Sequence, residues 1–209
     1  AAGCEVADFG SVGDDEPALE AVIGRAAAEA DVIISSGGVS MGDYDVVKGV
    51  LSGTGVDFLS VAMNPGKPLG FGLVGGRPFF GLPGNPVSVL VSFEQFARPA
   101  LLAMQGATAL LRPRISGVAG ERFTSDPAKE AFLRARITDH GGPVVVPTGG
   151  QASNVLSGLA AADCFAVLGV ALYLPLVAAL AITRAWRFTW TVRAAALVFG
   201  FGTLMVLGE

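Results

Sequence analysis

The spacing of apolar residues in the first third of the chain alternates between the periods of strands and helices. Residues 4–9 are predicted to form a strand. A loop at 12–17, with a candidate N-cap and an early proline, precedes a helix with apolar residues on one face: Leu19, Val22, Ile23, Ala26, Ala27 and Ala30. The β-branched run at 31–35 predicts the next strand. This order of elements indicates an α/β fold with a largely parallel sheet and flanking helices.

The middle of the chain predicts a hairpin, a long helix and a second group of strands. The VGGR turn at 74–77 separates two apolar segments, which makes the sheet mixed rather than purely parallel. Asn85 and Pro86 suit the cap and the first position of a helix that runs to about residue 105. Three later segments are predicted to be short antiparallel strands: 115–119, 132–137 and 143–146. We therefore expect an α/β domain at 1–110, a small β domain at 111–168 and an apolar tail at 169–209.

The strand at 31–35 ends in a stretch, SSGGVSMGDYD, that combines glycines, a serine and two acids. Gly37 and Gly38 let the backbone turn sharply and approach a ligand closely. Ser40 offers a hydroxyl, and amides at the start of a helix from about Asp43 favour an oxyanion. One of Asp43 and Asp45 can cap this helix while the other holds a hard cation such as magnesium. Taken alone, the stretch fits equally well with a capped strand-to-helix turn.

Two further loops carry similar chemistry. In NPGKP, at 64–68, two prolines bracket Gly66 and Lys67, so a stiff backbone presents a point charge that suits phosphate or molybdate. A solvated turn lysine is the alternative. GLPGNPVS, at 81–88, opens the long helix and provides a second glycine-rich helix start. A well-capped buried helix explains its capping residues, but it does not explain three such loops in succession.

The three motifs, in this order and spacing, resemble the molybdopterin molybdenumtransferase family, which includes the bacterial MoeA proteins and the E domain of gephyrin. The segment PTGGQASN at 147–154 is similar to the GGQGSH segment of that family. The resemblance runs from about residue 3 to about 168. It implies a MoaB/Mog-like α/β domain followed by a small all-β, barrel-like domain. Because full-length relatives carry two further domains and an opening strand and helix before this region, we expect an internal part of such a protein.

The resemblance also implies a reaction and the residues that carry it. Molybdate is inserted into adenylylated molybdopterin with release of AMP, and Mg²⁺ or a similar divalent ion assists. By motif position, Asp45 is the catalytic and metal-binding acid, and Lys67 is a catalytic residue of the molybdate site. Further motif residues are expected to bind the cofactor: Gly37, Gly38, Ser40, Gly66, Gly84, Asn85, Ser88 and Ser153. Asn64, Ala152 and Asn154 depart from the usual Lys, Gly and His.

Two other functions stay open. The chain could be a molybdopterin adenylyltransferase-like domain, although the NPGKP loop and the barrel-like domain argue against this. It could also be a non-catalytic molybdopterin-binding or membrane-tethered module, because much of the full-length relative is missing. By analogy with the family, we expect a homodimer that works in the cytoplasm.

Composition narrows the remaining choices. A net charge of −4 with scattered basic residues gives no sign of a nucleic-acid surface. The single histidine, His140, lies beside two glycines and a proline and is predicted to be a turn residue rather than a base. Cys4 and Cys164 lack the spacing of zinc ligands and are expected to be small buried hydrophobes in a reducing compartment.

From residue 169 on, the sequence no longer resembles the family. Residues 164–183 and 194–208 carry no charge, and the segment between them contains basic and aromatic residues: Arg184, Trp186, Arg187, Trp190 and Arg193. A membrane span needs about 20 apolar residues, so residues 169–209 could form a short or re-entrant hairpin in contact with a membrane. A fusion to part of a membrane protein and a junction of two unrelated coding sequences are the favoured interpretations. An apolar helical pair buried in an oligomer is the fourth.

Overall fold

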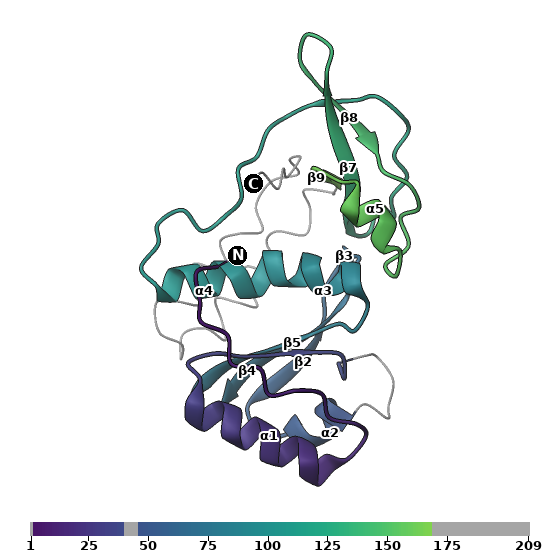
Figure 1. Ribbon diagram of the computed structural model, residues 1–209. Coiled ribbons are helices and arrows are strands. Elements are labelled where there is room, and N and C mark those ends of the chain that lie inside the picture. The colour runs from purple at the N-terminus through teal and green to yellow at the C-terminus, as the bar shows by residue number, and fades with distance from the viewer. Residues whose placement is uncertain (1, 40–45, 169–209) are drawn as a thin grey trace. The chain divides into compact units, whose positions relative to one another are not determined.

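A computed structural model describes residues 2–39 and 46–168 of the 209-residue chain (Figure 1). These residues divide into two compact units. The first comprises residues 1–61 and 66–97, and the second comprises residues 62–65 and the residues from 98 on. The predicted tail at 169–209 lies outside the described residues.

The first unit is built around a mixed four-stranded sheet with the order β1-β5-β4-β2. Its strands are β1 (Ile33–Ser36), β2 (Val56–Ser60), β4 (Pro68–Val74) and β5 (Arg77–Leu82). β1 and β5 are parallel, whereas β4 pairs antiparallel with both β5 and β2. The sheet is therefore mixed, as predicted. One of its three pairings is parallel, because short connections join β2 to β4 and β4 to β5.

The hairpin between β4 and β5 forms where the VGGR turn predicts it. Val74 pairs with Arg77, and the two residues between them, Gly75 and Gly76, have φ angles of 56° and 80°. Two successive left-handed residues give the turn the twist that neighbouring strands require, and glycine adopts this conformation without a steric cost. Arg77 also forms an ion pair of 3.1 Å with Asp31, just before β1.

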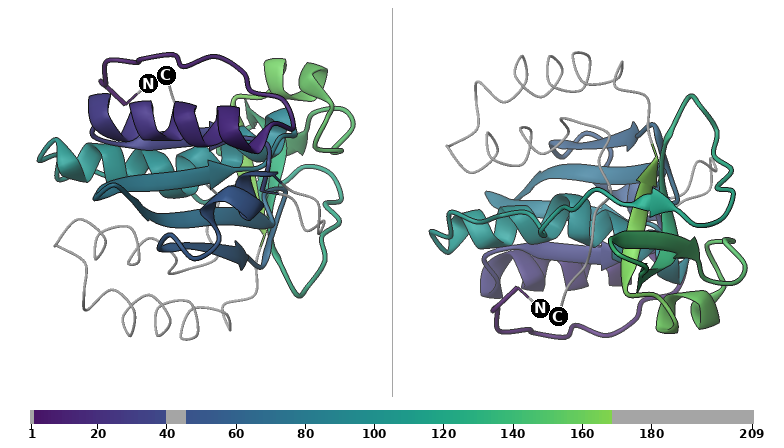
Figure 2. Two further views of the ribbon diagram at one scale, coloured as in Figure 1. Left: turned by 90° about the horizontal axis from the view of Figure 1, so that it is seen from below. Right: turned by 90° about the horizontal axis from the view of Figure 1, so that it is seen from above.

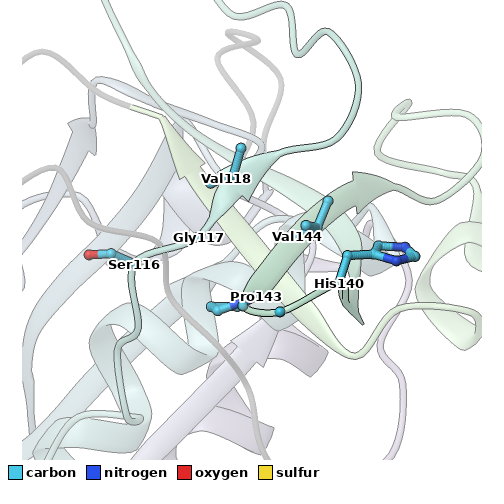
Figure 3. Close-up of a pocket in the computed structure, with 8 residues that line it drawn as sticks. Ser116, Gly117, Val118, His140, Pro143 and Val144 are labelled. Carbon is cyan, nitrogen blue, oxygen red and sulfur yellow. The ribbon is translucent and has the colours of Figure 1, made fainter.

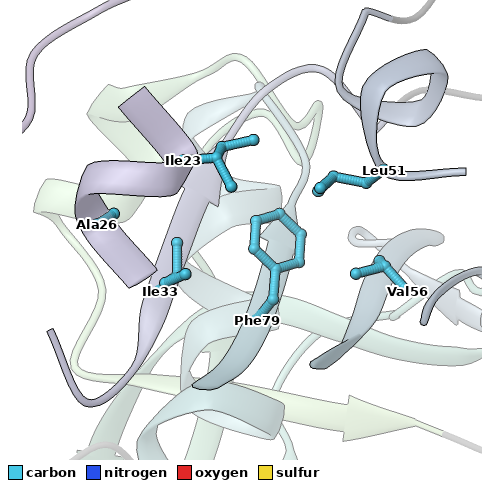
Figure 4. Packing of buried hydrophobic residues seen from close by; sticks show 6 residues of the cluster. All are labelled: Ile23, Ala26, Ile33, Leu51, Val56 and Phe79. Carbon is cyan, nitrogen blue, oxygen red and sulfur yellow. The ribbon is translucent and has the colours of Figure 1, made fainter. Parts of the chain in front are cut away.

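Helices lie on both faces of this sheet (Figure 1). α1 (Glu16–Glu29) and α2 (Val46–Leu51) cover one face, where six buried residues form a core: Ile23, Ala26, Ile33, Leu51, Val56 and Phe79 (Figure 4). The Asp15 side chain accepts a hydrogen bond of 3.1 Å from the Ala18 amide and so caps α1. Since alternate residues of a strand face opposite sides, Phe80 points to the other face, where its ring centroid lies 5.1 Å from that of Phe71.

The prediction of a strand at residues 4–9 is wrong. These residues, all within the described part of the chain, pair with no strand, and Val6 is 83% exposed. Phe9 instead packs against the core beneath α1, and the Arg25 guanidinium lies 5.7 Å from its ring centroid. A single aromatic side chain thus fixes this segment in place of a hydrogen-bonded ladder.

The long helix runs from Pro86 to Met104 and changes its winding in the middle. α3 (Pro86–Ser92) leads into the π-helical turn η1 (Phe93–Ala97), and α4 (Arg98–Met104) continues the helix. Pro99 lacks an amide hydrogen, and its ring would clash with a carbonyl one turn back, so the wider π turn accommodates it. By length and composition alone, this is the one helix in the described part of the chain that could cross a membrane, and 56% of it is buried in the protein.

The second unit is a five-stranded sheet centred on β7 (Glu130–Asp139), seen from another side in the right panel of Figure 2. Its other elements are β3 (Met63–Asn64), β6 (Val118–Ala119), β8 (Pro143–Pro147), β9 (Cys164–Leu168) and the helix α5 (Leu156–Ala160). β8 and β9 flank β7 in antiparallel pairings. Six small or apolar side chains form its core: Ala131, Leu133, Ala135, Val145, Cys164 and Ala166.

Two further expectations need correction, one in this unit and one in the first unit. The predicted strand at 115–119 shortens to β6 and pairs parallel with β8. The ten residues between β6 and β7 carry the chain far enough for β6 to join β8 rather than β7. Cys164 is buried as predicted, but Cys4 is exposed because it belongs to the unpaired N-terminal segment.

Candidate functional site

Three loops of the first unit lie at the same edge of its sheet. β1 and β5 are parallel, so both end at this edge, and β4 runs in the opposite direction, so it begins there. The loop after β1 contains Gly37 and Gly38, the loop before β4 contains Gly66 and Lys67, and the loop after β5 contains Gly84. Segments up to about fifty residues apart in the chain thus meet at one site.

The loops after β1 and β5 contact each other through bare backbone. The Gly37 amide donates a hydrogen bond of 2.9 Å to the Leu82 carbonyl. Gly37 and Gly38 have φ angles of 85° and 70°, which most side chains disfavour. A Cβ atom on Gly84 would lie 3.5 Å from the Cα atom of Gly37. Gly37 and Gly38 therefore permit the left-handed turn, and the hydrogen bond from Gly37 joins the main chains of the two loops.

Lys67 lies at the start of β4, beside these loops. The backbone around it is held by a hydrogen bond of 2.7 Å from the Val61 amide to the Lys67 carbonyl. Gly66 is buried with a φ of 103°, whereas Lys67 is exposed. Within the described residues, Lys67 has no ion-pair partner. Its ammonium group is thus a surface cation at the edge where the glycine loops lie.

The loop after β5 leads directly into α3. Asn85 occupies the N-cap position, but its side chain forms no capping hydrogen bond, and Pro86 begins the helix. Gly84 and Asn85 are exposed, in contrast to Ser88, which is 6% exposed in the first turn of α3. The predicted binding residues of this loop therefore fall into an exposed pair and a buried serine.

The predicted metal-binding segment lies outside the described residues, because Ser40, Asp43 and Asp45 all fall in the range 40–45. Within residues 2–39 and 46–168, no group of three or more His, Cys, Asp or Glu side chains is placed to hold a metal ion. The Mg²⁺ site and the role of Asp45 remain predictions.

Ser153 belongs to a loop of the second unit, and a buried arginine holds that loop. Arg134, on β7, is 1% exposed. Its guanidinium group donates hydrogen bonds of 2.7 Å to the carbonyls of Gly150 and Val155 and of 3.2 Å to that of Ala152. Burial lowers the pKa of this guanidinium, which nevertheless stays charged at neutral pH. Three carbonyl groups around one cation fix the course of the loop that presents Ser153.

Gln151 completes this arrangement. Its side-chain oxygen accepts a hydrogen bond of 2.9 Å from the Arg134 amide, and its side-chain nitrogen donates one of 3.0 Å to the Arg134 carbonyl. Gln151 thus pairs with β7 as a neighbouring strand would. Neither residue was predicted to belong to the site, although Gln151 lies within the PTGGQASN segment. The available signal was an arginine inside the otherwise apolar segment AFLRA, where a charge needs buried partners.

The second unit also contains an open cavity of about 370 Å³ at the turn between β7 and β8 (Figure 3). It is lined by residues 116–118 and 140–144. His140 lies in this turn, as predicted, and its side chain is exposed. The Asp139 carboxylate accepts hydrogen bonds of 3.0 Å from the amides of Gly141 and Gly142, which shapes the turn. The walls of the cavity are mostly apolar, so it offers little to an anionic ligand.

Comparisons with known proteins match both units. The family described as "Probable molybdopterin binding domain" matches residues 1–103, and the one described as "MoeA C-terminal region (domain IV)" matches residues 116–170. The chain is 44% identical over 169 residues to Molybdopterin molybdenumtransferase 2 of Mycobacterium tuberculosis, covering 78% of this chain and 42% of that protein. It is 38% identical over 169 residues to the Haemophilus influenzae molybdopterin molybdenumtransferase, covering 79% of this chain and 42% of that protein.

Solved structures agree with these matches. A crystal structure of the molybdopterin biosynthesis MoeA protein from Pyrococcus horikoshii superposes with a TM-score of 0.60 at 29% identity, covering 74% of this chain and 37% of that chain. The chain spans less than half the length of the curated relatives it matches. This chain matches a molybdopterin-binding domain followed by a MoeA C-terminal region, and over these residues it belongs to the MoeA family of molybdopterin molybdenumtransferases.

Proposed function

We propose that this chain binds molybdopterin-adenylate and molybdate at the loop edge of the first unit and inserts molybdenum with release of AMP. The observation that carries the proposal is the meeting of the three loops, where the Gly37 amide bonds to the Leu82 carbonyl and Gly84 lies near Gly37, beside Lys67. Bare glycine backbone lets a bulky anionic ligand approach the main chain closely. The exposed ammonium group of Lys67 supplies a positive charge for phosphate or molybdate oxygens.

Mg²⁺ fits this proposal through Asp45, and the described residues contain no cluster of three or more His, Cys, Asp or Glu placed to hold a metal ion. Magnesium is commonly held by one or two carboxylates together with water and the phosphate oxygens of the substrate, so a three-residue cluster is not needed. When bound, the ion would neutralise charge on the phosphoanhydride as it is cleaved. Lys67 would share this task by binding the oxyanion, and the glycine loops would orient the pterin.

We further propose that Ser153 takes part in binding the cofactor, and that two copies of the protein form a dimer, as expected from the family resemblance. The match of residues 116–170 to a MoeA C-terminal region argues against a stand-alone adenylyltransferase. One rival function keeps support. That rival is a module that binds molybdopterin without turning it over, and AMP release distinguishes it from the enzyme.

Titration of molybdopterin into the full 209-residue chain tests the binding step. Replacing Lys67 by glutamine should weaken binding roughly tenfold, the effect expected from losing one charge-assisted hydrogen bond. Lys129→Gln is the matched control, because Lys129 is partly exposed and pairs only with the equally exposed Asp126 at 2.7 Å. Equal affinities for the two variants would contradict the proposed site.

AMP release from molybdopterin-adenylate separates the enzyme from the binding module. Asp45→Asn should abolish metal-dependent AMP release and leave molybdopterin binding in place. A wild-type chain that binds molybdopterin but releases no AMP with Mg²⁺ and molybdate present would establish the binding module instead.

A further inference from the structure

Val39 is buried although the residue before it in the loop is exposed. It lies three residues beyond the end of β1 and is 3% exposed, whereas Gly38 before it is exposed. A valine that is fully buried outside any helix or strand needs a specific place to pack. The structure provides one above β5.

That place is the space left by Gly81. A Cβ atom on Gly81 would lie 2.6 Å from the Cγ1 atom of Val39, a distance that real Cβ contacts do not show. It would also lie 3.1 Å from the Phe79 ring and 3.3 Å from the Cα atom of Gly70. The Val39 side chain therefore occupies the position where residue 81 would otherwise place its own side chain.

The two glycines before Val39 explain how it arrives there. Gly37 and Gly38 both have positive φ angles, so the chain reverses its course immediately after β1. The Gly37 amide is bonded to the Leu82 carbonyl, and Val39 packs on the neighbouring Gly81. The loop is thus attached to two successive residues of β5: to Leu82 by a hydrogen bond and to Gly81 by the packing of the Val39 side chain.

We propose that Val39 and Gly81 are positioning residues that set the distance between the two glycine loops of the molybdopterin site. Neither residue needs to touch the ligand. Their contact, together with the Gly37–Leu82 hydrogen bond, holds the loop after β1 on β5 and so keeps the exposed Gly38 in a fixed place near the loop that contains Gly84. This inference rests on the proposed function, because it assigns the contact a role in binding at that same edge.

The substitution Gly81→Ala tests the contact directly. The added methyl group should displace Val39, and the Gly37 amide should then exchange its hydrogen at least about tenfold faster, since its bond to Leu82 is lost. Molybdopterin affinity should fall by a similar factor. In the double variant Val39→Ala with Gly81→Ala, the smaller side chain at 39 leaves room for the methyl group. Both the Gly37 exchange rate and the affinity should return most of the way toward wild type.

Gly70→Ala is the matched control. Its Cβ atom would lie 3.3 Å from the Cα atom of Gly81 and from the Phe58 ring, so it strains the same pair of strands, and Val39 is not among its three nearest neighbours. This variant should leave the Gly37 exchange rate and the affinity near wild type. Val39→Ala alone, which introduces no clash, should accelerate Gly37 exchange even if Gly81→Ala folds poorly.

Three results would overturn the inference: unchanged Gly37 exchange in Gly81→Ala and Val39→Ala, a double variant as impaired as the single one, or a Gly70→Ala variant with the same defects. A wild-type chain that fails to bind molybdopterin would contradict the proposed function instead. The exchange rate of Gly37 needs no ligand, so it still reports on the contact in that case.

Discussion

Replacing Arg134 by methionine should release the loop that carries Ser153. Arg134 is almost fully buried and donates to three backbone carbonyls, those of Gly150, Ala152 and Val155, at 2.7–3.2 Å. Methionine fills similar space but offers no donor. An unsatisfied buried acceptor costs about 1–3 kcal/mol. Water can reach some of the three carbonyls after the substitution, so the cost is less than three full penalties. We expect the free energy of unfolding of the second unit to fall by about 3–5 kcal/mol, the range found when one partner of a buried ion pair is removed.

Arg136→Met is the matched control for this variant. Arg136 lies two residues further along β7, is exposed, and should tolerate the same change within about 0.5 kcal/mol. Urea unfolding followed by far-ultraviolet circular dichroism gives the free energies, and limited proteolysis shows whether cleavage begins within residues 149–155. Equal stability of the two variants, with no new cleavage, would refute the role assigned to Arg134.

Three further predictions concern stability and reactivity. Burial raises the pKa of Glu130 more than the positive charge of Arg114 lowers it. The folded state therefore binds this proton more tightly than the unfolded chain does. As a result, the stability of the fold decreases as the pH rises from the ordinary carboxyl pKa of 4.5 through the raised value. Glu130→Gln should therefore melt at a higher temperature than wild type at pH 7, and the gap should close below pH 4.5; a gap that stays constant with pH would contradict this assignment. Burial, and then the charge of Asp163, raise the pKa of the Cys164 thiol to about 11, so iodoacetamide should label Cys4 in the native protein and Cys164 only after unfolding, as peptide mass spectrometry would show. Gly72→Ala should strongly destabilise the first unit, because its Cβ atom would lie within 3 Å of three backbone atoms of Gly55 and Val56. Gly24→Ala, in an open position on α1, should instead stabilise that unit by about 0.5–1 kcal/mol. If Gly72→Ala and Gly24→Ala shifted the melting temperature in the same direction, this prediction would be refuted.

Features set by short stretches of chain were predictable from the sequence. The cap at Asp15 and the hairpin at Gly75 and Gly76 depend on residues only a few positions apart, and both form where they were expected. The meeting of the glycine loops also follows from strand order once the sheet is known. Asp45, the predicted metal ligand, and Ser40, a predicted cofactor-binding residue, lie outside the described residues, and their roles stay predictions.

Features that depend on distant partners were not predictable. Residues 4–9 have the spacing of a strand, but whether they pair depends on a neighbour that the local pattern does not specify. The parallel pairing of β6 with β8 is set by the length of the connection to β7. The partners of Arg134 lie 16 to 21 residues further along the chain, so its role becomes visible only when β7 and the loop are seen together.

Mapping backbone amide shifts by nuclear magnetic resonance, while molybdopterin is titrated into the full chain, tests the central claim most directly. The account predicts that the largest shifts fall on the loop edge of the first unit, at Gly37, Gly38, Gly66, Lys67 and Gly84. Shifts that cluster instead around the cavity at residues 140–144, or that leave the glycine loops unchanged at saturation, would contradict it.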